Sequence, residues 1–218
     1  MLEQLYDLIP KHYLEKSGSV FYSGRDAFTG QKDVYLLGLN PGGDPKDPNE
    51  HIIKNHALSV MNDKPNDWSE YRDESWQGHP PGSYRMQPRV LHLLKQLNLS
   101  PGQVPASNLV FFRSKGAKNV NRNHVNECWS FHECVINELK PKAIICFGTT
   151  NTGKFVREKL NATKVVDIFV ESNNRKVSSY AYRCASGLLV ISLSHPSRYA
   201  WNIKEADPSE MVRRVLYS

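Results

Sequence analysis

Two short polar segments follow apolar runs and hold side chains that could take part in catalysis. Asn40-Pro-Gly-Gly-Asp44 comes directly after residues 36–39, and His195-Pro-Ser-Arg-Tyr199 comes after residues 191–194. An amide cannot take a proton near neutral pH, but it can orient a water molecule or hydrogen-bond the edge of a base. An imidazole can serve as a donor or as a charged stabiliser. Either pair alone is common turn chemistry, whereas both together at strand ends indicate a site.

The prolines and glycines of these segments are suited to holding side chains at the rim of a sheet. Pro41 restricts the backbone, and Gly42 and Gly43 allow it to approach a ligand closely. Pro196 restricts the turn that presents His195.

A third segment, from Gly148 to Lys154, has the glycine and lysine spacing of a phosphate-binding loop. The residue after Lys154 is Phe155, where such a loop needs Ser or Thr to hold magnesium. A plain helix-opening turn is therefore the better interpretation, and a magnesium-dependent nucleotide hydrolase is the weaker alternative.

A basic stretch lies shortly after Asn108. Arg113, Lys115, Lys118 and Arg122 fall within ten residues, and no acidic residue interrupts them. The stretch is typical of a loop that follows a phosphate backbone, and equally of a solvated loop without a partner.

The elements that must position these residues alternate along the chain. Apolar patterns predict strands at 34–39, 104–112, 143–147, 164–170, 177–184 and 188–193. Helices are expected at 2–16, 49–61, 90–97, 125–139 and 152–160, with a last one opened by Asp207 and Pro208. This alternation predicts an α/β fold with a mainly parallel sheet covered on both faces, in a single domain spanning 1–218. In such sheets, ligands bind beyond the carboxyl ends of the strands.

Residues 62–86 are expected to form a long inserted loop. The segment is polar and rich in proline and glycine, yet it carries Trp68, Tyr71, Trp76 and Tyr84. Because disordered segments are poor in aromatic residues, the loop is expected to be ordered and functional.

Composition excludes several classes of protein. The 218 residues have a net charge of +6, a pI of about 9.1 and a mean hydropathy of −0.53, which are typical of a globular protein without membrane spans. The first residues have no apolar core of a signal peptide, so we expect a cytoplasmic protein. The four cysteines form no CxxC pair and are expected to be small core residues.

Gly38-Leu-Asn40-Pro-Gly42 resembles the first motif of the uracil-DNA glycosylase superfamily, and His195-Pro-Ser197 resembles its second motif. Further similar segments lie between them in the order seen in the iron–sulfur branch: Ser107-Asn108, Asn121-Arg122, Cys128-Trp-Ser-Phe131, Leu139-Lys-Pro141 and residues 143–148. The similarity covers about residues 34–202.

The resemblance implies a three-layer α/β/α sandwich and a monofunctional DNA glycosylase that hydrolyses the bond to a flipped-out uracil or related damaged base. Asn40 would position the attacking water, and His195 would stabilise negative charge on the departing base. Asn108 would read the base edge, beside Gly38 and Leu39. The DNA contacts implied are Pro41, Gly42, Gly43, Ser197, Arg198, Tyr199, Arg113, Lys115 and Arg122, with Arg198 and Tyr199 in the position of the wedge.

The sequence departs from the family pattern at two places. No cysteine precedes Cys128, and Phe112 stands where another is expected, so we predict no iron–sulfur cluster, no metal and no cofactor. The family's stacking Phe is missing near Pro80-Pro81-Gly82, where Tyr84 or Trp76 is the expected substitute.

No lysine occupies a motif position, so lyase activity is not expected. The expected partner is DNA with a damaged base, bound by a monomer without membrane contact. The alternative is a catalytically silent superfamily member that binds nucleic acid or nucleotides.

Overall fold

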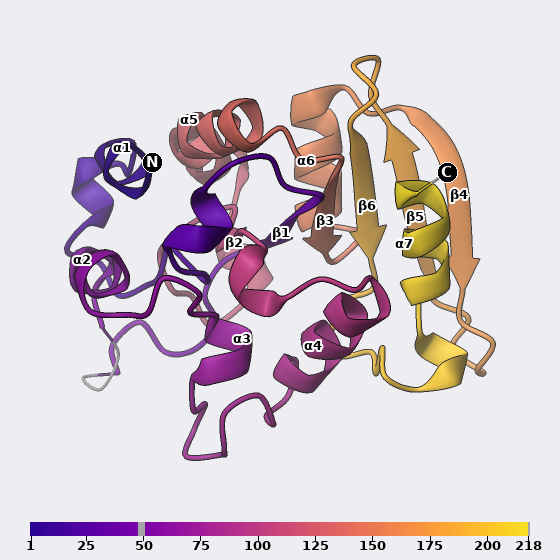
Figure 1. Cartoon of the computed structure of the whole chain (residues 1–218), viewed down its shortest axis with the longest axis horizontal. Helices are drawn as coiled ribbons and strands as arrows, with labels where there is room; N and C mark the ends of the chain where they lie inside the picture. The colour runs from indigo at the N-terminus through magenta and orange to yellow at the C-terminus, as the bar shows by residue number, and fades with distance from the viewer. Residues whose placement is uncertain (48–50, 218) are drawn as a thin grey trace.

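A six-stranded sheet forms the centre of the molecule in the computed structural model, which describes residues 1–47 and 51–217 (Figure 1). The strand order is β2-β1-β3-β6-β5-β4. The strands are β1 (Val34–Gly38), β2 (Ala106–Asn108), β3 (Ala143–Phe147), β4 (Lys164–Val170), β5 (Ser178–Arg183) and β6 (Leu189–Leu193).

Four neighbouring strands run in the same direction. β2, β1, β3 and β6 pair in parallel, whereas β5 pairs antiparallel to β6, and β4 antiparallel to β5. The four parallel strands are buried along their whole length, as expected for continuous apolar runs covered on both faces. Their carboxyl ends therefore share one edge of the sheet, which confirms the predicted mainly parallel α/β architecture.

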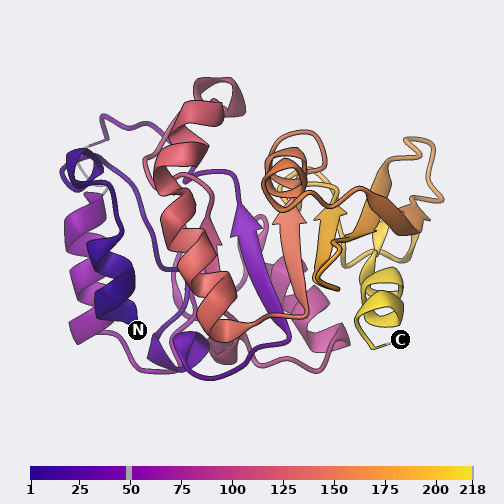
Figure 2. The same ribbon diagram turned by 90° about the horizontal axis from the view of Figure 1, so that it is seen from above.

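Helices cover the two faces of the sheet and complete three layers (Figure 2). They are α1 (Leu2–Asp7), α2 (Ile53–Asn62), α3 (Glu70–Asp73), α4 (Gln87–Gln96), α5 (Arg122–Leu139), α6 (Thr152–Leu160) and α7 (Ser209–Leu216). None of these helices, within the described part of the chain, is long and apolar enough to span a membrane.

Successive strand residues point to opposite faces and so divide the core in two. Tyr35 and Leu37 pack with α1, α2, α5 and α6, whereas Val34 and Leu36 pack with α3, α4 and α7. This alternation is the two-residue period of an extended strand.

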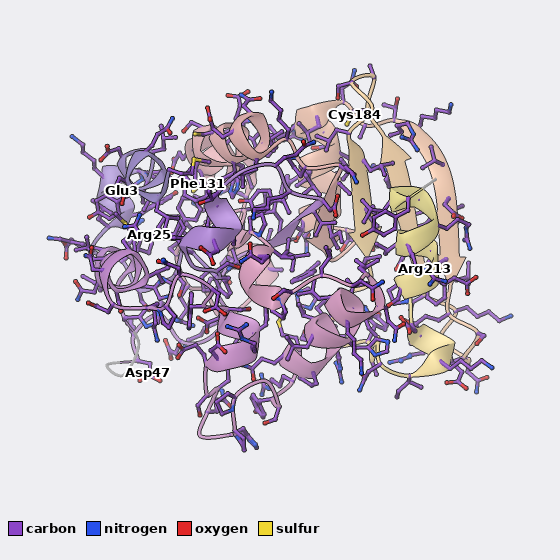
Figure 3. The ribbon with its side chains drawn as sticks, viewed as in Figure 1. Glu3, Arg25, Asp47, Phe131, Cys184 and Arg213 are labelled. Carbon is purple, nitrogen blue, oxygen red and sulfur yellow. The ribbon has the colours of Figure 1, made fainter. Side chains whose placement is uncertain are left out.

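The N-terminal helix is shorter than the expected 2–16. α1 ends at Asp7, and a separate 3₁₀ turn, η1, spans Lys11–Tyr13. Pro10 lies between them and lacks the N–H that a continuing helix would need. Arg25 on η2 (Arg25–Phe28) then joins α1 to the rest of the fold through an ion pair of 2.7 Å with Glu3 (Figure 3).

The bounds of other predicted elements also differ from those in the structure, most of all at β2 and α2. The strand expected at 104–112 is regular only over Ala106–Asn108, because the residues after it pair with loop backbone, including Leu39 and Ser17. The helix expected at 49–61 runs as Ile53–Asn62, and positions 49 and 50 of that prediction lie outside the described residues.

The loop expected at 62–86 is largely irregular, and it contains the short helix α3. Its tryptophans are held by carboxylates of the same segment: Trp68 Nε1 donates to Glu74 at 2.8 Å, and Trp76 Nε1 donates to Glu70 at 2.7 Å. The buried Gln87 amide also donates to the Glu70 and Glu74 carbonyls. These bonds stabilise one conformation of a segment that has little regular structure.

Candidate active site at the carboxyl edge of the sheet

The sheet topology brings Asn40, Asn108 and His195 to the same edge. Asn108 ends β2 and is paired in register with Gly38, which ends β1, and Asn40 follows two residues later. His195 follows the end of β6, one strand beyond β3. A Cβ added at Gly148, just after β3, would lie 3.6 Å from His195 Cδ2, so the imidazole lies against the end of the strand between β1 and β6.

The Asn108 amide lies directly against β1. A Cβ added to Gly38 would be only 2.0 Å from Asn108 Oδ1, a separation that real Cβ atoms do not show. Asn108 is buried, with 6% of its surface exposed. The Asn108 amide can therefore lie here only because residue 38 has no side chain. The sequence predicted Gly38 as a residue lining the base site, but not this steric role.

Hydrogen bonds determine which way the Asn40 amide points. Its Nδ2 donates to the carbonyls of Pro41 and Phe112, at 2.8 and 3.4 Å, and to Ser114 Oγ at 2.8 Å. Carbonyl oxygens only accept, so the nitrogen must face them and Oδ1 is left as an acceptor on the other side. Ser114 in turn donates to the Gly116 carbonyl at 3.1 Å. Sequence reasoning missed Ser114, because no motif marks it.

The basic stretch after Asn108 holds the loop that carries Asn40. Gly42 forms a parallel bridge with Ser114, and Arg113 Nη1 donates to the Gly42 carbonyl. Lys115 forms an ion pair of 2.8 Å with Asp44, which lowers the pKa of that carboxyl group. Arg122 is turned toward α6 instead, where it pairs with Glu158 at 2.6 Å. Arg113 and Lys115 therefore lie at the loop that carries Asn40, whereas Arg122 is paired with Glu158 on α6.

The His195 ring is neutral and has a defined tautomer. Its Nδ1 accepts from the Ser197 backbone N–H at 3.1 Å and lies 2.8 Å from Ser197 Oγ. A peptide N–H only donates, so Nδ1 carries no proton and Nε2 carries it. Burial, and secondarily the charge of Arg198, lowers the pKa of His195 to about 4. At pH 7 the ring can donate from Nε2 without bearing a charge.

The two residues in the wedge position differ in their surroundings. The backbone N–H groups of Arg198 and Tyr199 both donate to the His195 carbonyl, at 2.9 and 3.1 Å. The Arg198 side chain is exposed, whereas the Tyr199 ring lies beneath the guanidinium of Arg175 at 5.0 Å. Arg198 is thus the side chain that projects from this turn.

The aromatic ring beside Asn108 is Tyr22. Its hydroxyl lies close enough to the side chains of Asn108 and Ser19 for both to affect its pKa, which burial raises. Tyr22 N also donates to the Ala106 carbonyl at 3.0 Å, which aligns the N-terminal segment along β2. Sequence reasoning missed Tyr22, since nothing local in the sequence indicates that this segment pairs with β2.

Tyr84 and Trp76, the aromatic residues expected to stack on the base, have contacts of their own. Tyr84 stacks on His79, with ring centroids 4.1 Å apart, and its hydroxyl donates to Gln77 at 2.8 Å. Trp76 is engaged by Glu70 and packs edge-on against Tyr71. Both rings therefore have partners within the 62–86 segment, and Tyr71 in turn lies against Tyr22, with ring centroids 5.9 Å apart.

The glycine-rich turn after β3 has the geometry of a helix start. The Thr152 hydroxyl donates to the Phe147 carbonyl at 2.9 Å, and Gly153 N donates to the Gly148 carbonyl at 2.9 Å. A Cβ at Gly153 would lie 2.2 Å from Ser192 Oγ, so this glycine allows α6 to approach β6 closely. Two donors of the turn, the Thr152 hydroxyl and Gly153 N, are thus used within it, which favours the interpretation as a helix-opening turn.

The described residues, 1–47 and 51–217, hold no cluster of metal-binding side chains. No three His, Cys, Asp or Glu side chains gather there in a way that could hold a metal ion. The four cysteines are free thiols, and burial raises the pKa of each of them.

The chain matches the model of a known protein family. The model of the Uracil DNA glycosylase superfamily matches residues 26–216, a range that contains Asn40, Asn108 and His195. A search of curated proteins returns no match.

Proposed function

Because the chain belongs to the uracil DNA glycosylase superfamily, we propose that it is a monofunctional DNA glycosylase that removes a flipped-out uracil or related damaged base by hydrolysis. The observation that carries the proposal is that a hydrogen-bond acceptor and a hydrogen-bond donor lie at the same edge of the sheet. Asn40 presents an acceptor and His195 presents a neutral donor. Hydrolysis of a glycosidic bond needs an acceptor for the water and a donor for the leaving base.

Asn40 would act on the water. Its Oδ1 accepts a hydrogen bond from a water molecule and directs the oxygen lone pair toward the sugar C1′. An amide is a weak base, but cleavage through an oxocarbenium-like sugar needs little activation of the nucleophile when the leaving group is stabilised. The three acceptors around Nδ2 prevent the amide from rotating and losing this orientation.

His195 would act on the departing base. As the C1′–N bond breaks, negative charge accumulates on the pyrimidine ring and its carbonyl oxygens. The Nε2–H donates to one of these oxygens, and the lowered pKa favours a neutral ring whose tautomer is already set by Ser197. A donor oriented in advance stabilises the developing anion with little reorganisation.

Asn108, Tyr22 and Arg198 would recognise the extruded nucleotide. The Asn108 amide hydrogen-bonds the base edge, and the Tyr22 ring forms a wall beside it. Arg198, exposed one residue after Ser197, would enter the gap left in the duplex. Gly42 leaves open space where a Cβ would be, which suits close approach of a phosphate. We propose that one domain spanning 1–218 carries all these groups.

Release of free base from a uracil-containing oligonucleotide tests the proposal. We expect release by the wild type and a loss of at least about 100-fold in Asn40→Ala and in His195→Ala, in line with removal of one pre-oriented transition-state group. Asn126→Ala and His12→Ala are the matched controls, because both side chains are exposed and lie on helical segments. Equal rates in all five proteins would refute these roles.

A second candidate is a superfamily member that binds nucleic acid without cleaving it. The contacts of Tyr84 and Trp76 within their own loop favour this candidate, because each ring already has partners there that stacking on a base would have to accommodate. The same assay separates the candidates: binding retained without base release in any variant, across a panel of modified bases, supports the non-catalytic protein.

A further inference from the structure

The turn between β4 and β5, residues 171–177, lies at the same sheet edge as the candidate active site. β5 is antiparallel to β6, with Tyr180 opposite Ser192, so β5 begins where β6 ends. Val170 and Ser178 form the last pair of the β4–β5 hairpin at this edge (Figure 1). The opposite end of the hairpin is the pair Lys164–Arg183, next to Cys184, which is labelled in Figure 3.

Hydrogen bonds give this turn a defined shape. Glu171 accepts from Asn173 Nδ2 at 2.7 Å, and Glu171 N donates to the Val177 carbonyl at 2.9 Å. Asn173 Oδ1 accepts from Arg175 N at 2.9 Å, which closes a local turn. Ser172 N donates to the Glu205 carbonyl at 2.9 Å and so attaches the turn to η5 (Lys204–Ala206). A surface held this way loses little conformational entropy on binding.

The charges of the turn are arranged to leave it positive. The Glu171 side chain is fully buried, whereas 53% of the Arg175 side chain is exposed and Lys176 is exposed next to it. Arg175 lies 3.7 Å from the Glu171 carboxylate, so part of its charge is balanced internally. The other exposed charged residues nearby, Lys204 and Glu205 on η5, have opposite charges and add no net charge.

Arg175 connects the turn to the His195 segment. Its guanidinium lies 5.0 Å from the centre of the Tyr199 ring, and Tyr199 N donates to the His195 carbonyl. Arg198, the residue before Tyr199, is exposed, as are Arg175 and Lys176. This places three cations on two segments that are in direct contact, next to the proposed catalytic donor.

We propose that the β4–β5 turn is a second phosphate-binding element, in which Arg175 and Lys176 contact the DNA backbone flanking the nucleotide held at His195. The inference rests on the proposed function, since it takes DNA as the ligand. Arginine and lysine side chains supply the sequence-independent phosphate contacts that fix the register of a protein on a duplex. The turn would lengthen the footprint on one side of the extruded base.

Two double variants with equal loss of charge test the element. Arg175→Gln/Lys176→Gln removes two cations from the turn, and Lys164→Gln/Arg183→Gln removes two from the other end of the same hairpin. The probe is a labelled duplex with a central uracil, and the measurement is Kd by fluorescence anisotropy at 50 and 200 mM salt. Two lost phosphate contacts should reduce the slope of log affinity against log salt concentration by about 1.8. The ratio of wild-type affinity to that of Arg175→Gln/Lys176→Gln should therefore be about 12-fold smaller at 200 mM salt than at 50 mM. The control variant should keep the wild-type affinity and slope.

A further variant separates a phosphate contact from a packing role. Lys176→Gln keeps the contact between Arg175 and Tyr199. By itself it should lower the slope of log affinity against log salt concentration by about 0.9. Equal behaviour of the two double variants, or a wild-type slope in Lys176→Gln, would overturn the inference while leaving wild-type base release intact. A wild-type protein without affinity for any DNA would overturn the proposed function together with it.

Discussion

Substitution of Gly38 by alanine should disturb the site through one contact. The added Cβ would lie 2.0 Å from Asn108 Oδ1, and this separation must open to 3.0 Å or more. The Asn108 amide is therefore displaced by at least about 1 Å, because β1 is buried and hydrogen-bonded on both sides.

The displacement predicts a loss of stability and a larger loss of activity. Overpacking of this kind costs about 1–3 kcal/mol in the free energy of unfolding. At about 2–4 °C per kcal/mol for a chain of this size, Tm should fall by about 2–12 °C. A misplacement of about 1 Å in a substrate-positioning group can reduce the rate about 100-fold, so single-turnover base release should fall by about that factor.

A double-mutant cycle identifies the contact responsible. Asn108→Ala removes the oxygen that the new Cβ would meet, so Gly38→Ala should cost less than about 0.5 kcal/mol in that background, with a coupling of about 1–3 kcal/mol measured by urea denaturation. Gly42→Ala is the control for stability, because a Cβ there would have nothing within 4 Å. The reasoning is refuted if Gly38→Ala destabilises both backgrounds equally.

Three further predictions follow from the hydrogen bonds and pKa values. Ser114→Ala removes an acceptor of the Asn40 amide, so kcat should fall about tenfold, the equivalent of about 1.4 kcal/mol, while Ser114→Thr keeps it; an unchanged kcat in Ser114→Ala would show that the bond does not orient Asn40. Because the pKa of His195 is lowered to about 4, the ratio of wild-type to His195→Gln rates should stay constant from pH 5.5 to 8, and an inflection near 6.5 in the wild type alone would contradict the neutral ring. Burial raises the pKa of Glu70 from 4.5 to about 7, so between these values the folded state holds a proton that the unfolded chain has released, and stability falls as pH rises from about 4.5 to about 7 and then levels off; Glu70→Gln should therefore be more stable relative to wild type at pH 8 than at pH 5, measured by chemical denaturation, and an equal difference at both pH values would count against this.

Much of the fold could be predicted because its signals are local. Continuous apolar runs identified β1, β3 and β6, and their alternation with helices predicted a mainly parallel sheet. Polar segments at the ends of these runs then indicated one edge of the sheet as the site. Where predictions of element bounds were wrong, a long-range partner decided the outcome, as in the shortened β2, whose following residues pair with other loops.

By itself, the sequence determined which residue types stand at the carboxyl ends of the strands, because the pattern of apolar residues indicates which segments are buried strands and in what order they follow one another. Only the tertiary structure decided what those groups can do. The direction of the Asn40 amide depends on Ser114, the wall beside Asn108 is Tyr22, and the turn carrying Arg175 reaches Tyr199. Each of these contacts joins residues far apart in the chain, so no local pattern records it, and the polarity of a hydrogen-bonding group is set by the neighbours that folding brings to it.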